Sequence, residues 1–221
     1  CSHRLTIVTG HYGTGKTEFS VNLALALAGE GEQVMMADLD IVNPYFRSRE
    51  RKALLEDAGI RLICSSQACS DADVPALPAE VLTILENRDV RGVLDIGGDP
   101  VGARVLARFQ PKIVQEDYQL IFVLNANRPE VRDAESAAAY LRSIEAVTGL
   151  TCSGLVNNTH LCGETTPAEI RKGVALAQEV SRQTGIPILC HTAERRFLES
   201  LSDLGKPVFP IAINMKKPWE R

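Results

Sequence analysis

Hydrophobic positions along the chain fall into short runs rich in Val, Ile and Leu. The runs lack the alternation of a half-exposed strand, so they predict strands buried on both faces, as in a parallel sheet. The predicted strands are residues 5–9, 34–37, 61–64, 93–96, 120–124, 154–156, 186–190 and 208–211. They predict a mostly parallel sheet of about seven or eight strands.

Segments with helical spacing alternate with these runs. The last of them carries apolar residues on one face from Ile170 to Val180, with Pro167 at its entry and Gly185 at its end. The predicted helices are residues 17–28, 48–58, 78–87, 101–109, 129–148 and 167–184. Strictly alternating strands and helices predict an α/β fold, a three-layer α/β/α sandwich, formed by a single domain over residues 1–221. Residues 64–78 are the least regular stretch and predict a loop.

Ligands of such sheets bind beyond the carboxyl ends of the strands, so the residues that follow each strand are the first candidates for chemistry. The first strand is followed by Gly10-His11-Tyr12-Gly13-Thr14-Gly15-Lys16-Thr17, which matches the phosphate-binding pattern G-x-x-x-x-G-K-[ST]. Its backbone N–H groups and the following helix terminus attract phosphate. We expect Lys16 to reach the β- and γ-phosphates and the Thr17 hydroxyl to ligate Mg²⁺.

Two acidic motifs follow other strands of the predicted sheet. Asp38 and Asp40 end the second strand and face the same side of an extended backbone. One is expected to hold Mg²⁺ through water and the other to orient the attacking water; an acidic turn that only ends the strand is the alternative. Asp95 begins a D-x-x-G pattern whose Gly98 offers a bare backbone N–H to a γ-phosphate. Asp99 belongs either to this group or to the N-cap of the next helix.

Composition restricts the classes of function. The 221 residues are 45% hydrophobic and 24% charged, with a formal net charge of −4, so no overall positive charge favours nucleic acid or anionic lipid. Without a leader-like segment or a long apolar run, we expect a cytoplasmic protein that is neither exported nor membrane-inserted. The six cysteines form no C-x-x-C pair and predict reduced thiols, Cys64 and Cys69 included. We interpret His3, His160 and His191 as residues of the surface or the site rim.

The order of the P-loop, D-x-D and D-x-x-G motifs resembles the MinD/ParA/CobQ-type branch of P-loop ATPases over nearly the whole chain. The branch includes cell-division regulators, plasmid-partition ATPases and the nitrogenase iron protein. The resemblance implies ATP, ADP and Mg²⁺ as ligands, Asp40 as the water-activating residue and Asp38 and Asp95 as carboxylates on the metal side. It also implies that Gly98 senses the γ-phosphate. Asn158, or Asn157 in its place, would contact adenine; the alternative is that both only shape a turn. The N-K-x-D guanine motif is absent here.

The sequence departs from the family pattern at three places. His11 stands where the signature lysine that reaches a partner's nucleotide is usual, so the homodimer that the resemblance implies would need His11, Arg47, Arg49 or Arg128 in that role. Position 102 is Gly where the iron protein has a cluster cysteine. Residues 214–221 contain Pro218 and do not predict an amphipathic membrane helix.

Three functions remain open from the sequence. The first is an Mg-ATP-dependent switch with slow, partner-stimulated hydrolysis, in which an unidentified protein reads the state of the nucleotide. The second is an ATP-dependent ligase or kinase that resembles dethiobiotin and cobyrinate amidation enzymes, with Asp38 or Arg47 meeting a small carboxylic acid near residues 64–78. The third is a nucleotide-binding adaptor without catalysis. The basic residues Arg47, Arg49, Arg51 and Lys52 either bind a partner or form a solvated helix face.

Overall fold

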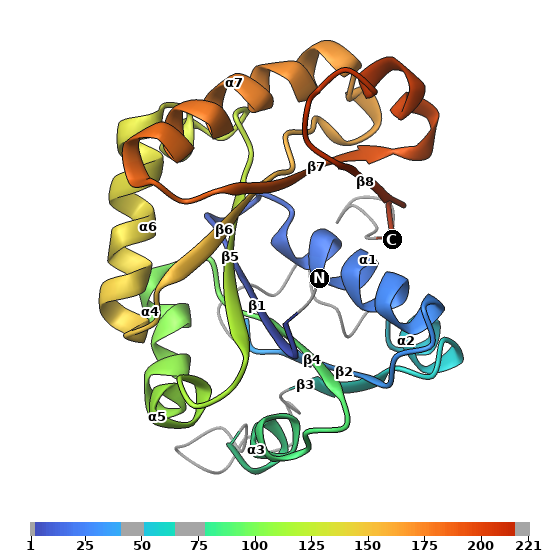
Figure 1. Cartoon of the computed structure of the whole chain (residues 1–221), viewed down its shortest axis with the longest axis vertical. Helices are drawn as coiled ribbons and strands as arrows, with labels where there is room; N and C mark the ends of the chain where they lie inside the picture. The colour runs from blue at the N-terminus through green and yellow to red at the C-terminus, as the bar shows by residue number, and fades with distance from the viewer. Residues whose placement is uncertain (1–2, 41–50, 65–77, 215–221) are drawn as a thin grey trace.

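The computed structural model describes residues 3–40, 51–64 and 78–214. Its strands form one sheet in the order β3-β2-β4-β1-β5-β6-β7-β8, and every neighbouring pair is parallel. The strands are β1 Leu5–Thr9, β2 Val34–Asp38, β3 Arg61–Cys64, β4 Arg91–Asp95, β5 Tyr118–Leu124, β6 Cys152–Asn157, β7 Ile188–Glu194 and β8 Val208–Ile211. The predicted parallel sheet is confirmed, and β1, which leads into the P-loop, lies inside it (Figure 1).

Helices connect the strands as the alternating pattern predicts. The α-helices are α1 Lys16–Gly29, α2 Lys52–Asp57, α3 Pro78–Glu86, α4 Pro100–Ala103, α5 Gln110–Ile113, α6 Ala134–Thr148 and α7 Pro167–Thr184. Shorter 3₁₀ turns are η2 Arg104–Arg108, η3 Pro129–Val131, η4 Cys162–Glu164, η5 Arg195–Phe197 and η6 Glu199–Leu201.

Two apolar cores lie on opposite faces of the sheet and make the three layers. Alternate residues of β1, β2 and β5 serve the two cores: Ile7 of β1 belongs to the core that includes residues of α3, η2, α5, α6 and α7, whereas Val8 belongs to the core that includes residues of α1 and α2. The two groups of helices lie on either side of the strands in Figure 1. Because both faces are covered, the strands consist of continuous apolar runs.

The helix predicted before β5 and the helix predicted after it differ from the structure in their bounds. Residues 101–109 form no single helix: α4 is one short turn, η2 continues it, and α5 begins anew with Pro111 in its first turn. Residues 129–148 divide at Asp133, whose carboxylate accepts a hydrogen bond from the backbone N–H of Ser136 and so begins α6. Of the predicted helix 48–58, residues 48–50 lie outside the described residues.

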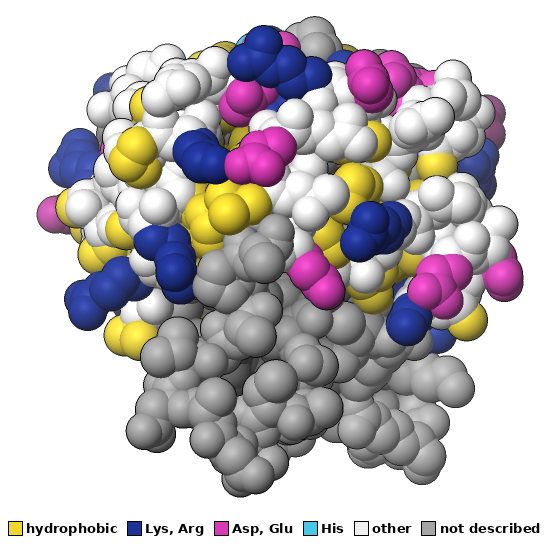
Figure 2. Space-filling model, turned by 90° about the horizontal axis from the view of Figure 1, so that it is seen from below, with side chains coloured by type: hydrophobic (Ala, Val, Ile, Leu, Met, Phe, Trp, Pro, Cys, Tyr) yellow, Lys and Arg dark blue, Asp and Glu magenta, His cyan; other side chains and the backbone are white. Residues whose placement is uncertain are grey.

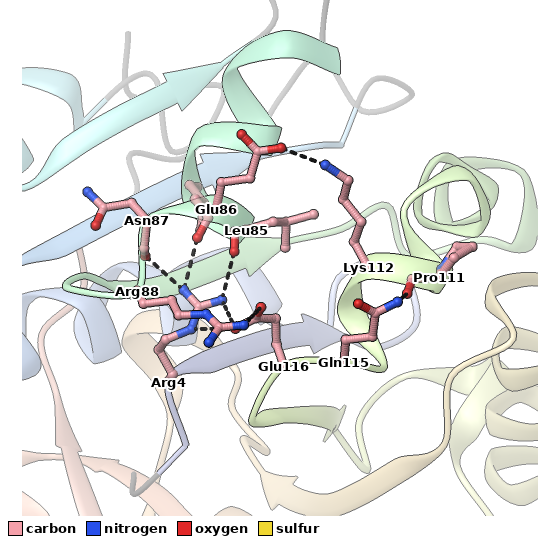
Figure 3. A network of polar contacts seen from close by, with 10 residues as sticks. Arg4, Leu85, Glu86, Asn87, Arg88, Pro111, Lys112, Gln115 and Glu116 are labelled. Atoms are coloured by element: carbon pink, nitrogen blue, oxygen red, sulfur yellow. Dashed lines mark hydrogen bonds and ion pairs between the residues drawn. The ribbon is translucent and has the colours of Figure 1, made fainter.

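At the amino ends of the strands, Arg4 joins three parts of the chain (Figure 3). Its Nη atoms donate to the carbonyls of Ile84 and Leu85 at the end of α3, at 2.9 and 3.2 Å. Its Nε and Nη2 donate to Oε2 of Glu116, at 3.0 and 2.7 Å. Carbonyls at a helix end lack intrahelical partners, so this arginine caps α3 and holds it against the segment that leads into β5.

At the other side of the fold, the helix that follows the P-loop is tied to β8. The side-chain amide of Asn22 on α1 donates to the carbonyl of Ala212 at 2.9 Å and accepts from its backbone N–H at 2.8 Å. The backbone N–H of Asn214 donates to Oε1 of Glu18 at 2.8 Å. These bonds fix the position of α1 relative to the segment after β8.

The described surface carries both signs of charge, and the described cysteines are thiols. On the described part of the face in Figure 2, Lys and Arg side chains are interspersed with Asp and Glu rather than gathered by sign. In the described part of the chain, no helix combines the length and the apolar character needed to cross a membrane.

Cys152, Cys162 and Cys190 are free, and burial raises the pKa of the Cys152 and Cys190 thiols to about 12. Both remain protonated at neutral pH.

Candidate nucleotide-binding site

The loop between β1 and α1 has the conformation that its glycines allow. Gly13 and Gly15 have φ values of 76° and 83°, in the left-handed region that favours glycine. Thr14 closes the turn, since its backbone N–H donates to the carbonyl of His11 at 3.1 Å. A Cβ on Gly15 would lie 2.3 Å from Nδ2 of Asn158, so no other residue is accommodated there without a shift. The loop ends in α1, whose terminal N–H groups favour an anion.

Lys16, the first residue of α1, meets the carboxylates that follow β2. Its Nζ lies 3.2 Å from Oδ2 of Asp40, and both side chains are almost fully buried. The backbone N–H of Asp40 donates to Oδ1 of Asp38 at 3.1 Å. The structure therefore brings together the predicted lysine and the D-x-D pair, and β2 and β4 place Asp38 directly beside Asp95 in the sheet.

Asp95 ends β4 and is completely buried. Its Oδ1 accepts a hydrogen bond from the Ser20 hydroxyl at 3.3 Å, whereas its Oδ2 has no hydrogen-bond partner in the part of the chain that the structure describes. The pKa of Asp95 is raised to about 7, with burial as the largest cause; the nearby carboxylates of Asp38 and Asp40 also raise it, whereas Lys16 and Thr17 lower it. A cation beside this carboxyl would favour its ionised form.

The donor set at this point is suited to Mg²⁺. The buried Oδ2 of Asp95 and the Thr17 hydroxyl are hard oxygen ligands, the type that Mg²⁺ prefers. In the described ranges, no three His, Cys, Asp or Glu side chains are grouped to hold a metal ion. Mg²⁺ at phosphate sites needs no such group, because one or two protein oxygens complete a shell of phosphates and waters.

The D-x-x-G segment packs directly on the P-loop. A Cβ on Gly98 would lie 2.7 Å from the carbonyl oxygen of Gly10 and 3.0 Å from the backbone nitrogen of Tyr12. The Tyr140 hydroxyl donates to the carbonyl of Gly98, and the ring of His11 contacts Tyr140 with centroids 4.8 Å apart. His11 is thus directed toward α6, while Tyr12 remains half exposed.

Asp99 is the N-cap of α4. Its Oδ1 accepts from the backbone N–H groups of Val101 and Gly102, at 2.8 and 2.9 Å. The capping interpretation is therefore the one that the structure supports.

Asn157 ends β6 and Asn158 follows it, and both side chains are buried and hydrogen-bonded. Nδ2 of Asn158 donates to the carbonyl of Thr14 at 2.8 Å, and its Oδ1 accepts from the Thr192 hydroxyl. Nδ2 of Asn157 donates to the carbonyl of Ile170 at 3.1 Å. Asn158 thus contacts the P-loop directly, while Asn157 joins β6 to α7.

A pocket lies beside Asn158 at the carboxyl ends of β6, β7 and β8. Its lining combines apolar side chains with hydroxyl, amide and carboxylate groups. The lining residues are Asn158, Thr159, His160, Thr165, Ile170, Thr192, Ala193, Glu194, Ile211 and Ile213.

Two side chains at the P-loop were not singled out by motif. Nε of Arg128 donates to the carbonyl of Gly13 at 2.6 Å. Nε2 of His160 would lie 3.0 Å from a Cβ on Gly15; burial, with a smaller effect of the Arg128 charge, lowers its pKa to about 4. Both follow strands, β5 and β6, where chemistry is expected. The sequence predicts Arg128 only as one possible substitute for the signature lysine and His160 only as a residue of the surface or the site rim.

Several other predicted residues lie elsewhere. His191 does not lie at the surface: it is buried in β7, where its ring nitrogen contacts Nδ2 of Asn157 at 3.3 Å. Lys52 is exposed and pairs with Glu56 at 3.6 Å, as on a solvated helix face. Arg47, Arg49, Cys69 and most of the stretch 64–78 lie outside the described residues, and with them the expected substrate pocket of the ligase alternative.

Solved structures share this fold at low sequence identity. The signal recognition particle receptor FtsY from Elizabethkingia anophelis, in complex with GDP, matches 87% of the chain with a TM-score of 0.56 and 16% identity. The cell division protein FtsY from Thermotoga maritima matches 86% with a TM-score of 0.57 and 21% identity. The chain spans 58% and 61% of these two proteins. At this level of identity the similarity shows the fold.

Sequence comparison gives a relative of similar length. The septum site-determining protein MinD of Helicobacter pylori is 23% identical over 239 aligned positions, which include 98% of this chain and 87% of the relative. Residues 5–211 match the model of the CobQ/CobB/MinD/ParA nucleotide binding domain, a span from β1 to the end of β8. With its P-loop, D-x-D and D-x-x-G motifs at three adjacent strand ends, the chain belongs to the CobQ/CobB/MinD/ParA nucleotide-binding family of P-loop proteins.

Proposed function

We propose that this protein is an Mg-ATP-dependent switch that hydrolyses ATP slowly and passes its nucleotide state to a partner. The observation that carries the proposal is the 3.2 Å contact between the buried Lys16 Nζ and Asp40 Oδ2. A P-loop lysine in contact with a strand-end carboxylate places a phosphate-binding cation beside a group able to orient water.

In this proposal each residue has a separate task. The amides of residues 10–17 and Lys16 bind the phosphates, and Asp40 orients the attacking water once the γ-phosphate has taken its place at Lys16. Asp38, Asp95 and the Thr17 hydroxyl lie on the side of Mg²⁺, which would neutralise phosphate charge when bound. Gly98, packed on Gly10 and Tyr12, responds to the γ-phosphate. Motion of Gly98 is the signal that a partner reads.

Adenine is the proposed base. Asn158 lies between the P-loop and the mixed pocket at β6, β7 and β8, a position that supports a contact with the base. The residues that follow it, Thr159-His160-Leu161, lack the lysine and aspartate of the guanine motif N-K-x-D. The FtsY structure in complex with GDP has 16% identity to this chain and gives no direct basis for guanine here.

Phosphate release from purified protein tests the proposal. Mg-ATP and Mg-GTP are compared, and the Lys16→Ala variant measures contaminating activity. Turnover that depends on Lys16 and prefers ATP is the expected result. Binding of nucleotide without turnover, unchanged by Asp40→Asn, would instead favour the adaptor function, and turnover only after addition of a small carboxylic acid would favour the ligase.

A further inference from the structure

Arg128 brings a cation to the P-loop from a different strand end. It follows β5, and its backbone N–H donates to the carbonyl of Asn125 at 3.0 Å. A Cβ on Gly13 would lie 2.7 Å from Cζ of Arg128, so the guanidinium lies directly against the bare backbone of the loop. Only Nε is used in the bond to the Gly13 carbonyl. An arginine has four further N–H donors on its two Nη atoms.

No described carboxylate forms an ion pair with Arg128. The nearest acidic residues in sequence have other partners: Glu130 lies 3.9 Å from His11, and Asp133 lies 4.0 Å from Arg132. The positive charge of Arg128 contributes to the low pKa of His160, which is therefore neutral at pH 7. A half-buried guanidinium with no paired carboxylate among residues 3–40, 51–64 and 78–214 favours an anionic ligand.

The position of Arg128 along the P-loop indicates which anion this side chain would bind. The first half of the P-loop packs on Gly98, while Gly13 and Gly15 in the second half pack against Arg128, Asn158 and His160. This second half adjoins the pocket at β6, β7 and β8. Backbone amides of a P-loop surround the α- and β-phosphates, and the lysine serves the β- and γ-phosphates. Arg128 is thus beside the part of the loop that leads from the phosphates to the base.

We propose that the Nη groups of Arg128 bind the α- and β-phosphates of the nucleotide, as a clamp supplied by the chain itself. The inference rests on the proposed function, since it requires a nucleotide in the P-loop. It adds that di- and triphosphates share this contact, so Arg128 determines affinity for both and takes no part in sensing the γ-phosphate.

Calorimetric titration with Mg-ADP and with a non-hydrolysable Mg-ATP analogue tests the clamp. Arg128→Ala is expected to weaken both ligands at least about tenfold and by the same factor, since a charged hydrogen bond is lost for each. Arg132→Ala, which removes an exposed arginine from the same segment, is the matched control and should bind as the wild type does. Equal binding by Arg128→Ala and wild type would overturn the clamp, as would an effect on the triphosphate alone.

Arg128→Gln and Arg128→Lys distinguish a contact with phosphate from a purely structural contact with the Gly13 carbonyl. Gln keeps a donor for the Gly13 carbonyl without the charge, so wild-type affinity in this variant would contradict the clamp; Lys keeps the charge and should recover part of the affinity. The salt dependence of binding should also become shallower in Arg128→Ala, because the variant lacks one charged contact that salt would screen. An unchanged salt dependence would show that Arg128 only stabilises the P-loop through Gly13. If the wild type binds no nucleotide and Lys16→Ala changes nothing, the proposed function itself has failed.

Discussion

The hydroxyl of Tyr140 on α6 donates a hydrogen bond to the backbone carbonyl of Gly98, so the D-x-x-G segment and a long helix are joined without an intermediate residue. Burial raises the pKa of Tyr140 to about 12, which keeps the hydroxyl protonated and able to donate at neutral pH. Since Gly98 also touches Gly10 and Tyr12, a movement of the P-loop reaches α6 through one residue.

Removing this hydroxyl should separate nucleotide binding from the response of α6. We expect Tyr140→Phe to bind nucleotide as the wild type does and to lose about 1 kcal/mol of stability. In the wild type a triphosphate should alter amide hydrogen exchange at the start of α6, and in the variant that change should be absent. Tyr118→Phe is the control, because the Tyr118 hydroxyl has no hydrogen bond among the described residues. An unaltered response in Tyr140→Phe would show that α6 is not coupled through this bond.

Substitutions of Lys16 and Asp40 should separate nucleotide binding from hydrolysis. Lys16→Ala is expected to lose most triphosphate affinity, about a hundredfold or more, because the cation on the phosphates is gone. Asp40→Ala should keep binding and lose hydrolysis. Asp40→Asn should bind as tightly as the wild type or more so, since the carboxylate that competes for Lys16 Nζ is neutralised. Equilibrium titration with phosphate release measures both properties; wild-type turnover in Asp40→Ala would refute the role given to that residue.

Gly98 should tolerate no side chain. In Gly98→Ala the new Cβ would collide with backbone atoms of Gly10 and Tyr12, which have no flexible end to move away. We expect a loss of about 1–3 kcal/mol in stability and at least about tenfold in nucleotide affinity. Gly29→Ala at the end of α1 meets no atom within 4 Å and should be neutral or slightly stabilising. Thermal unfolding with and without Mg-ADP compares the two variants, and similar behaviour would mean that the loops do not pack as described.

His160 should make stability depend on pH between about 6.5 and 4. Its pKa is lowered from 6.5 to about 4 by burial, so the folded state disfavours the protonated ring. The contribution is present above pH 6.5 and is lost as the pH falls toward 4, since the unfolded chain then binds more protons. From pH 7 to pH 5 the wild type should lose about 2 kcal/mol more than His160→Gln, as measured by urea unfolding. Parallel pH curves would show that His160 is solvated.

Arg4 should affect stability and leave the nucleotide site unchanged. Arg4→Ala leaves the carbonyls at the end of α3 and the carboxylate of Glu116 without their donors, and we expect a cost of about 2–3 kcal/mol. Arg88 also approaches Glu116, at 3.7 Å, but its side chain is 78% exposed, so Arg88→Ala should cost less than about 0.5 kcal/mol. Denaturant midpoints and Mg-ADP titration provide the two measurements, and a fall in nucleotide affinity with Arg4→Ala would contradict the separation.

The buried strands could be predicted from the sequence because a sheet covered on both faces needs continuous apolar runs, and these are visible without any contact information. Helix bounds were less predictable. Residues 101–109 have helical spacing, yet Gly102 packs against Gly97 and Pro111 starts a new turn, and both are effects of local geometry. At Asp133 the capping side chain is visible in the sequence, but Pro129 predicts an earlier start of the same helix.

For the candidate site, the motif residues could be listed in advance because each lies at a strand end. The relations between them could not, because Arg128 and Gly13 are 115 residues apart and no pattern joins them. Similarly, Tyr140 lies in the middle of a predicted helix, where a tyrosine ordinarily indicates packing. The Asp40 variants above test the role of that residue, and the roles of Asp38, Asp95, Asn157 and Asn158 remain predictions.

The bonds between Asn22 on α1 and Ala212 beyond β8 have a consequence for how the chain matures on the ribosome. The P-loop is synthesised first, but the helix that bears Lys16 and Thr17 is held by a segment made almost 200 residues later. Nascent chains that lack this segment would carry a complete phosphate-binding motif on a helix without its hydrogen bonds to Ala212. Competence to hold nucleotide is therefore expected to arise only after β8 and Ala212 have left the exit tunnel.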